Sequence, residues 1–387
     1  MSKPIDNFQR IPYEPARDGR VEMHSGLSRH YPTLHANLVT TAEDDRSVGL
    51  LMAHPSSDFL SHFLLRGFAD AGLPIMGMNT RYSSNEPALI MERAALDVGA
   101  GVRWMKEELG YRKVVLLGFS GGGSLTAFYQ AQAENPTVTE TPAGDPVDIA
   151  SAELVPADAL MLVGAHSGRA RVLRHWIDGS VTDELDPVSV ESDLDLYAPG
   201  REIPLDRKWV TRYRAAQLDR MRRIDDWALA ELDELTRRGA ADRAFVVHRT
   251  VADPRFVDIT LDPSDREPGS MYGDPRAANS AAGGLARFVS VRSWLSTWSF
   301  ERTNADAVRN LEDVKVPTLV MPLMGDQAAF ADDSRDMAAA SGHATVIELA
   351  DLNHYLVDQP EGVSTVTSQA KQWLVDALDV SPARSAS

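Results

Sequence analysis

The stretch KVVLLGFSGGGSLTAFY, residues 113–129, runs from an apolar block through a serine among glycines into a helical pattern. The block at 113–119 is typical of a strand buried on both faces, and the pattern from 122 onward is typical of a helix. So sharp a turn around a hydroxyl either cradles a phosphate or exposes a nucleophile. A phosphate cradle needs Gly-Lys-Ser/Thr or Gly-x-Gly-x-x-Gly, and neither pattern is present. The stretch therefore predicts a strand, a tight turn that presents Ser120, and a helix.

The turn has the pattern Gly-x-Ser-x-Gly, as Gly118-Phe119-Ser120-Gly121-Gly122. Small residues on both sides of the serine permit the strained bend that lifts its hydroxyl above a sheet. A Gly-Ser turn can also be purely structural, but the strand before it and the helix after it favour a nucleophile. We therefore predict that Ser120 is the nucleophile.

Apolar β-type runs alternate with helix-length patterns along the rest of the chain, which predicts an α/β fold. The first run, HANLVTT at 35–41, alternates as an edge strand does, whereas the later runs are continuous, as in strands buried on both faces. We expect a mostly parallel sheet of the eight-stranded type with helices on both faces. The other candidate strands are 47–55, 73–80, 157–168, 316–327 and 344–358, and crossover helices are predicted within 59–72 and 88–110.

A serine hydroxyl needs a base to activate it and an acid to orient that base. Asp326 lies at the end of the candidate strand segment 316–327, and His354, 28 residues later, lies in the loop that ends the last segment, 344–358. This spacing leaves room for one helix, and both side chains would lie at carboxyl ends of strands, where ligands bind in such sheets. Asp351 and Asp358 are rival acids, but they lie too near His354 in the chain to approach its ring from behind. We predict Asp326 as the orienting acid and His354 as the base.

About 150 residues separate the strands at 157–168 and 316–327, more than the sheet needs. We expect a large, mainly helical insertion that caps the active site. The segment LARFVSVRSWLSTWSF, residues 285–300, places Trp294 and Trp298 on one helical face. The two tryptophans either line an apolar pocket or pack between cap and core. The predicted divisions are a core part with the elbow at 1–165, a cap at 166–313, a core part with the acid and the histidine at 314–378, and a flexible tail at 379–387.

Composition excludes several classes of function. The chain has 39 basic and 56 acidic residues, and a net charge of -17 disfavours nucleic acid and anionic membranes as partners. Cysteine is absent, and no His-Glu-x-x-His or other tight ligand spacing occurs, so we predict neither a metal nor a cofactor. The first residues lack the apolar core of a secretory signal, and a cytoplasmic location is expected. We expect a small-molecule substrate as the partner, and the insertion helices leave a homodimer open.

With GFSGGG at 118–123, GD at 325–326 and NH at 353–354, the chain resembles the α/β-hydrolase superfamily over most of 40–165 and 312–378. The resemblance implies that an oxyanion is bound by the amide of Gly121 and by a second amide from the loop HPSSDF, residues 54–59. The common family pattern there is His-Gly-x. Because proline has no amide hydrogen, the implied second donor is Ser56, with Ser57 as the alternative. Further candidates for the pocket are His54, Phe119, His166 and Arg169.

The resemblance and the three residues together imply a serine hydrolase that works through an acyl-enzyme. Some enzymes of this fold carry an aspartate at the elbow, and the serine here points instead to acyl transfer. The expected substrate is a small or medium, largely uncharged ester or lactone, because polymers do not easily enter a capped pocket. Hydrolysis of a carbon–carbon bond in a diketone-like compound and acyl transfer to an alcohol or amine are alternatives. A binding protein without turnover would be expected to have lost part of the triad.

Overall fold

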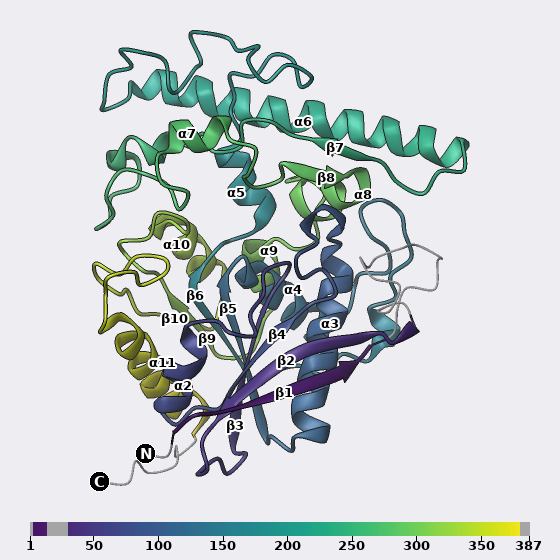
Figure 1. Cartoon of the computed structure of the whole chain (residues 1–387), viewed down its shortest axis with the longest axis vertical. Helices are drawn as coiled ribbons and strands as arrows, with labels where there is room; N and C mark the ends of the chain where they lie inside the picture. Colours follow the sequence, from purple (N-terminus) through teal and green to yellow (C-terminus); the bar gives the residue numbers. More distant parts are fainter. Residues whose placement is uncertain (1–2, 14–29, 380–387) are drawn as a thin grey trace.

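The computed structural model describes residues 3–13 and 30–379, and a central eight-stranded sheet organises them (Figure 1). The strand order is β1-β2-β4-β3-β5-β6-β9-β10. β2 is antiparallel to both β1 and β4, and the remaining neighbours are parallel, which confirms a mostly parallel sheet with an antiparallel edge. The bounds are β1 (Ile5–Pro12), β2 (Thr33–Thr40), β3 (Val48–His54), β4 (Ile75–Asn79), β5 (Lys113–Ser120), β6 (Ala159–Ala165), β9 (Thr318–Met321) and β10 (Ala344–Val346).

Helices cover both faces of the sheet, as predicted (Figure 1). Successive residues of a strand point to opposite faces, so Leu50 and Met52 of β3 enter one core while Leu51 and Ala53 enter the other. The first core is closed by α2 (Leu64–Asp70) and α11 (Gly362–Leu378). The second is closed by α3 (Met91–Arg103), α4 (Gly122–Glu134), α9 (Ala307–Leu311) and α10 (Ala331–Ala340).

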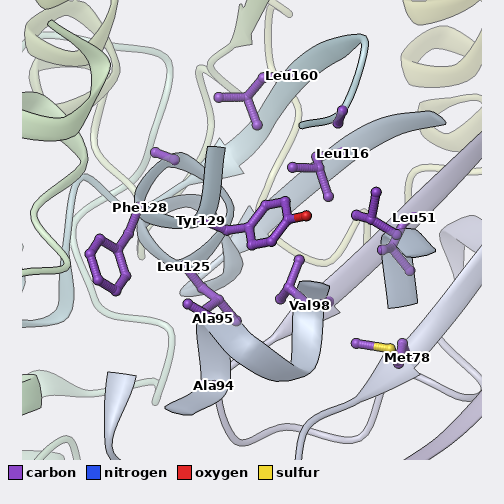
Figure 2. Close-up of a cluster of buried hydrophobic side chains, with 14 of the residues drawn as sticks. Leu51, Met78, Ala94, Ala95, Val98, Leu116, Leu125, Phe128, Tyr129 and Leu160 are labelled. Carbon is purple, nitrogen blue, oxygen red and sulfur yellow. The ribbon is translucent and has the colours of Figure 1, made fainter. Parts of the chain in front are cut away.

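Helix α4, which directly follows Ser120, lies in the second core (Figure 2). Every residue from 122 to 132 is buried, because α3 and α9 cover the sides of the helix that the sheet leaves open. Figure 2 shows Leu125 and Tyr129 of α4 beside Val98 of α3 and Leu116 of β5. This packing holds the start of α4, and therefore the turn around Ser120, in one position.

The insertion between β6 and β9 is largely helical and lies together beyond one end of the main sheet (Figure 1). Its longest element is α6, whose N-terminus is capped by the Asp206 carboxylate through the Trp209 amide at 2.9 Å. A two-stranded antiparallel sheet, β7 with β8, lies against the helices. The elements are α5 (Arg169–Trp176), α6 (Arg207–Arg237), β7 (Ala244–Val246), α7 (Pro275–Ser280), β8 (Phe288–Ser290) and α8 (Val291–Ser293).

The two ends of the insertion meet at a neck, which we define as Ser167 and Arg171 on the way out and Asp306 and Ala307 on the way back. The Ala307 amide donates to the Ser167 carbonyl at 2.9 Å. The Arg171 guanidinium donates to the Asp306 carboxylate at 2.7 Å. The insertion therefore leaves and rejoins the sheet at one place.

Three details differ from, or lie outside, the predicted architecture. β1 was not predicted, because its exposed sequence IDNFQRIP lacks an apolar face. The helix predicted within 285–300 begins as β8 and continues through α8 into a π-helical turn at 294–298. Helix α9 falls within the predicted cap range 166–313 yet packs against α4 of the core. The division into ranges stays a prediction, and of the predicted tail only Asp379 is described.

No helix in the described parts of the chain is both long and apolar enough to cross a membrane.

Candidate active site

Ser120 ends β5 with a backbone φ of +54°, a left-handed conformation that is strained for a residue with a side chain. The glycines around it are required by close packing. A Cβ on Gly118 would lie 2.5 Å from Thr126 Oγ1, and a Cβ on Gly122 would lie 2.3 Å from the Ala53 carbonyl oxygen. The small residues predicted to permit a tight turn therefore let α4 begin directly against β3 and β5.

The structure brings together Ser120, at the end of β5, Asp326, in the loop after β9, and His354, in the loop after β10. Ser120 Oγ lies 3.1 Å from His354 Nε2, and His354 Nδ1 lies 2.7 Å from Asp326 Oδ2. The other Asp326 oxygen accepts the amides of Ala328 at 2.6 Å and Ala329 at 3.0 Å. His354 is 4% exposed and Asp326 is 1% exposed, so water is largely excluded from the pair. The imidazole is thus oriented by the acid and faces the serine hydroxyl.

The rival acids lie elsewhere. Asp351 and Asp358 are both exposed, and both have a left-handed backbone with a φ of 59°. The Asp351 amide donates to the Asp265 carboxylate at 2.9 Å, which fixes the loop before His354 from the outside. The two residues therefore shape the loop that carries His354, whereas Asp326 contacts its ring.

Aromatic rings surround His354. The Phe119 ring lies 5.0 Å from that of His354, and the His166 ring lies 6.0 Å from it. His62, which was not predicted, packs against Phe119 at 4.9 Å. Burial, with His354 nearby, lowers the pKa of both His62 and His166 to about 3, so these two rings are neutral near pH 7. His62 lies within the predicted helical segment 59–72, and nothing in the sequence indicated that its side chain would approach the site.

The loop predicted to supply the second oxyanion donor is arranged around His54. Its Nδ1 atom accepts the amides of both Ser56 at 3.2 Å and Ser57 at 2.8 Å. Because Nδ1 accepts, the ring proton belongs on Nε2, and burial together with Arg169 holds the pKa of His54 well below its usual range. That Nε2 would lie 2.8 Å from a Cβ on Gly121. The predicted donor amide of Ser56 is therefore already engaged, and a side-chain N–H adjoins Gly121 instead.

Arg169, at the start of α5, reaches from the insertion to the same loop. Its Nη2 donates to Ser56 Oγ at 3.0 Å, and its Nη1 lies 2.9 Å from the Glu86 carboxylate. The guanidinium also stands 5.1 Å from the centre of the Trp298 ring. Glu86 was not predicted from the sequence. It lies in the loop after the candidate strand at 73–80, and an acidic residue at the carboxyl end of a parallel strand could have been recognised as a candidate.

Trp294 does not lie beside the triad, so it does not line a pocket there, which was one of its two predicted placements. It is fully buried in the core of the insertion, where its Nε1 donates to Asp225 at 2.6 Å. Trp298 is also fully buried, but it faces Arg169. The difference follows from the π-helical turn at 294–298, which breaks the regular helical spacing on which the prediction relied.

Within residues 3–13 and 30–379, no cluster of three or more His, Asp or Glu side chains is arranged to hold a metal ion.

No family model matches the sequence, and no curated protein matches it significantly. Solved structures do resemble the chain. The α/β-hydrolase GrgF from Penicillium sp. sh18 is 12% identical, with a TM-score of 0.51 over 97% of this chain and all of that one. The esterase domain of a Rhodothermus marinus protein is 10% identical, with a TM-score of 0.46 over 96% and 98% of the two chains.

A thermophilic esterase from Thermogutta terrifontis is 14% identical, with a TM-score of 0.42 over 96% of this chain and 99% of that one. At such identities a structural likeness establishes the fold alone, and the likeness to GrgF covers 97% of this chain. The strand order and the turn at Ser120 agree with it. The chain therefore has the α/β-hydrolase fold.

Proposed function

We propose that the protein is a serine hydrolase that cleaves a small or medium carboxylic ester or lactone through an acyl-enzyme. The observation that carries the proposal is the chain of contacts from Ser120 through His354 to Asp326, at 3.1 and 2.7 Å. Three segments far apart in sequence supply these groups, and the strained serine backbone has no evident structural use. A nucleophile, a base and an orienting acid in this geometry support acyl transfer.

In the proposed reaction, Ser120 Oγ attacks the substrate carbonyl carbon while His354 Nε2 takes the hydroxyl proton. The tetrahedral intermediate collapses as the bond to the leaving oxygen breaks, and His354 returns the proton to that oxygen. Water then repeats both steps on the acyl-enzyme, which releases the acid and restores Ser120. Asp326 keeps the proton of the neutral ring on Nδ1 and stabilises the imidazolium that forms.

The negative oxygen of the intermediate needs donors beside Ser120. We propose the Gly121 amide, at the start of α4, as the first and His54 Nε2–H as the second. The second assignment replaces the Ser56 amide, because that amide donates to His54 Nδ1 and its neighbour Ser57 does the same. The neutral state of His54 leaves the ring a donor through Nε2 alone.

We further propose that the insertion caps the site. Arg169 and Trp298 belong to the insertion, and Arg169 contacts Ser56 in the loop that also holds His54. A substrate at Ser120 would thus lie between the sheet and the insertion. Such an enclosed position favours a small molecule over a polymer.

The decisive experiment uses 4-nitrophenyl esters and a fluorophosphonate probe. Ser120→Ala should lower kcat by a factor on the order of 10⁶, as loss of the nucleophile does in serine proteases, and should abolish labelling. Ser124→Ala is the matched control, because Ser124 is a fully buried serine one turn further along α4. Full hydrolysis by Ser120→Ala, or phosphonylation at a different residue, would show that the proposed nucleophile is wrong.

A further inference from the structure

Buried polar atoms without a hydrogen-bond partner gather beside the triad. Among the residues that the structure describes, they include Nε of Arg169, Nε1 of Trp298 and Nδ1 of His166. Arg169 stands 5.1 Å from the Trp298 ring, and the His166 ring lies 6.0 Å from that of His354. Leaving such groups unpaired is costly, so native proteins rarely do it without a ligand, water or ion to satisfy them.

The charge beside the triad is that of Arg169, and the position of its guanidinium is fixed. Arg169 is only 6% exposed, and it is fixed by the Ser56 hydroxyl and the π-face of Trp298. Its counter-ion Glu86 also accepts the Ser56 hydroxyl at 3.0 Å, but its side chain is 32% exposed and can turn toward water. His54 and His166 face the guanidinium as neutral rings, and burial with Glu86 nearby raises the pKa of Tyr272 to about 12, so its hydroxyl is also uncharged.

We infer that the substrate carries a carboxylate, which Arg169 binds. This inference rests on the proposed function and differs from the expectation of a largely uncharged substrate. Once Glu86 turns away, Nη1 offers a substrate carboxylate a charge-assisted donor, and Nε–H is an unpaired donor on the other edge of the guanidinium. The indole N–H of Trp298 is a further buried donor without a partner, on the ring that the guanidinium contacts.

The inferred binding group is close enough to the triad for one small molecule to reach both. His166 bridges them on one side, since its ring neighbours that of His354 and its chain position is three residues before Arg169. On the other side Arg169 contacts Ser56, whose amide donates to His54 beside Gly121. The inferred substrate class is therefore a short ester or lactone with a carboxylate on its acyl or its leaving part.

Two matched pairs of esters test this on the intact protein. 4-Nitrophenyl hemiglutarate against 4-nitrophenyl valerate places the charge on the acyl part, and 4-carboxyphenyl against 4-carbamoylphenyl butyrate places it on the leaving part. In at least one of the two pairs, the wild type should have a higher kcat/KM for the anionic ester than for its neutral partner. Arg169→Gln should lower this ratio by about 30-fold or more. Arg169→Lys should retain part of it. Arg174→Gln, on the same helix but beside Phe300, is the control.

Binding without turnover separates this inference from the proposed function. In the Ser120→Ala background, titration calorimetry should show that Arg169→Gln weakens binding of the preferred anionic ester by about the same factor and leaves its neutral partner unaffected. Equal kcat/KM for anionic and neutral esters in both pairs, or a preference that survives Arg169→Gln, overturns the carboxylate site. Turnover by Ser120→Ala overturns only the proposed nucleophile, and the kcat/KM comparison of the two ester pairs then still decides the role of Arg169.

Discussion

Asp326 Oδ2 lies 2.7 Å from Nδ1 of His354, while its other oxygen is held by two backbone amides. The carboxylate is therefore fixed before any substrate arrives, and the imidazole is oriented by a group that cannot rotate freely. If the triad works as proposed, Asp326 is the residue of the three whose charge can be removed with the least change in side-chain size and position.

Asp326→Asn should lower kcat by up to about 10⁴-fold while the protein stays folded, because an amide in this place favours the wrong tautomer of His354. Steady-state kinetics with 4-nitrophenyl esters and circular dichroism measure the two effects. Asp351→Asn and Asp358→Asn should be nearly silent, since both positions are exposed and asparagine tolerates their left-handed backbone. An inactive, folded Asp351→Asn or Asp358→Asn beside an active Asp326→Asn would reassign the acid.

His54→Ala should reduce kcat by about 10²-fold to 10³-fold if the ring N–H stabilises the oxyanion. His54→Gln should recover part of the loss, because a carboxamide can accept the loop amides through its oxygen and donate through its nitrogen. Pre-steady-state acylation rates measure this. If the Ser56 amide were the true donor, His54→Ala would free it, and the alanine variant would acylate at least as fast as the glutamine variant.

Glu86→Gln should raise kcat/KM for the preferred anionic ester by about fivefold, because it removes the carboxylate that competes for Arg169. The neutral ester of the same pair serves as the internal reference. A fall in the preference for the anionic ester would mean that Glu86 positions Arg169 for binding rather than competing with the substrate.

His166 should make the protein less stable in mild acid. Its pKa is about 3 in the folded chain, mainly through burial, and near 6.5 when unfolded. Between these values the unfolded state binds the proton and the folded state does not, so stability falls as the pH is lowered, by roughly 1.4 kcal/mol per pH unit. His166→Gln removes this proton uptake from both states.

Urea denaturation at pH 7.5 and pH 5.0 checks the effect. The loss of stability at the lower pH should be about 2 kcal/mol greater for the wild type than for His166→Gln. Asp333 acts in the opposite direction, since burial raises its pKa to about 6, but it is present in both proteins and cancels in the difference. Equal losses in the two proteins would show that His166 is protonated in the folded state.

The fold and the three triad positions could be predicted because each depends on local patterns and on chain order. Buried parallel strands read as continuous apolar runs, and Asp326 and His354 follow two of them. The edge strand β1 could not be predicted in this way, because an exposed strand carries no apolar pattern. The arrangement around His54 was also hidden, because the direction of an amide in a loop depends on the side chain it meets.

Arg169 shows a different limit. An arginine that begins a helix in an insertion is usually solvated, and only the packing of Trp298 and Ser56 around it makes it a buried charge. Ser120, His354 and Asp326 could not indicate the substrate either. The same three residue types occur in enzymes that act on many different substrates. The inferred recognition of charge depends on a contact between Arg169 and Ser56, which lie more than 100 residues apart in the chain.

The neck formed by Ser167, Arg171, Asp306 and Ala307 brings the two ends of the insertion together. The segment from α6 to β8 can therefore change in length without separating these ends, provided that Asp265 keeps its contacts with Met324 and Asp351 of the core. Arg169 lies between the two neck residues on the outgoing side, so it would stay with the sheet through such a change. The preference for charge and the preference for size could then change independently.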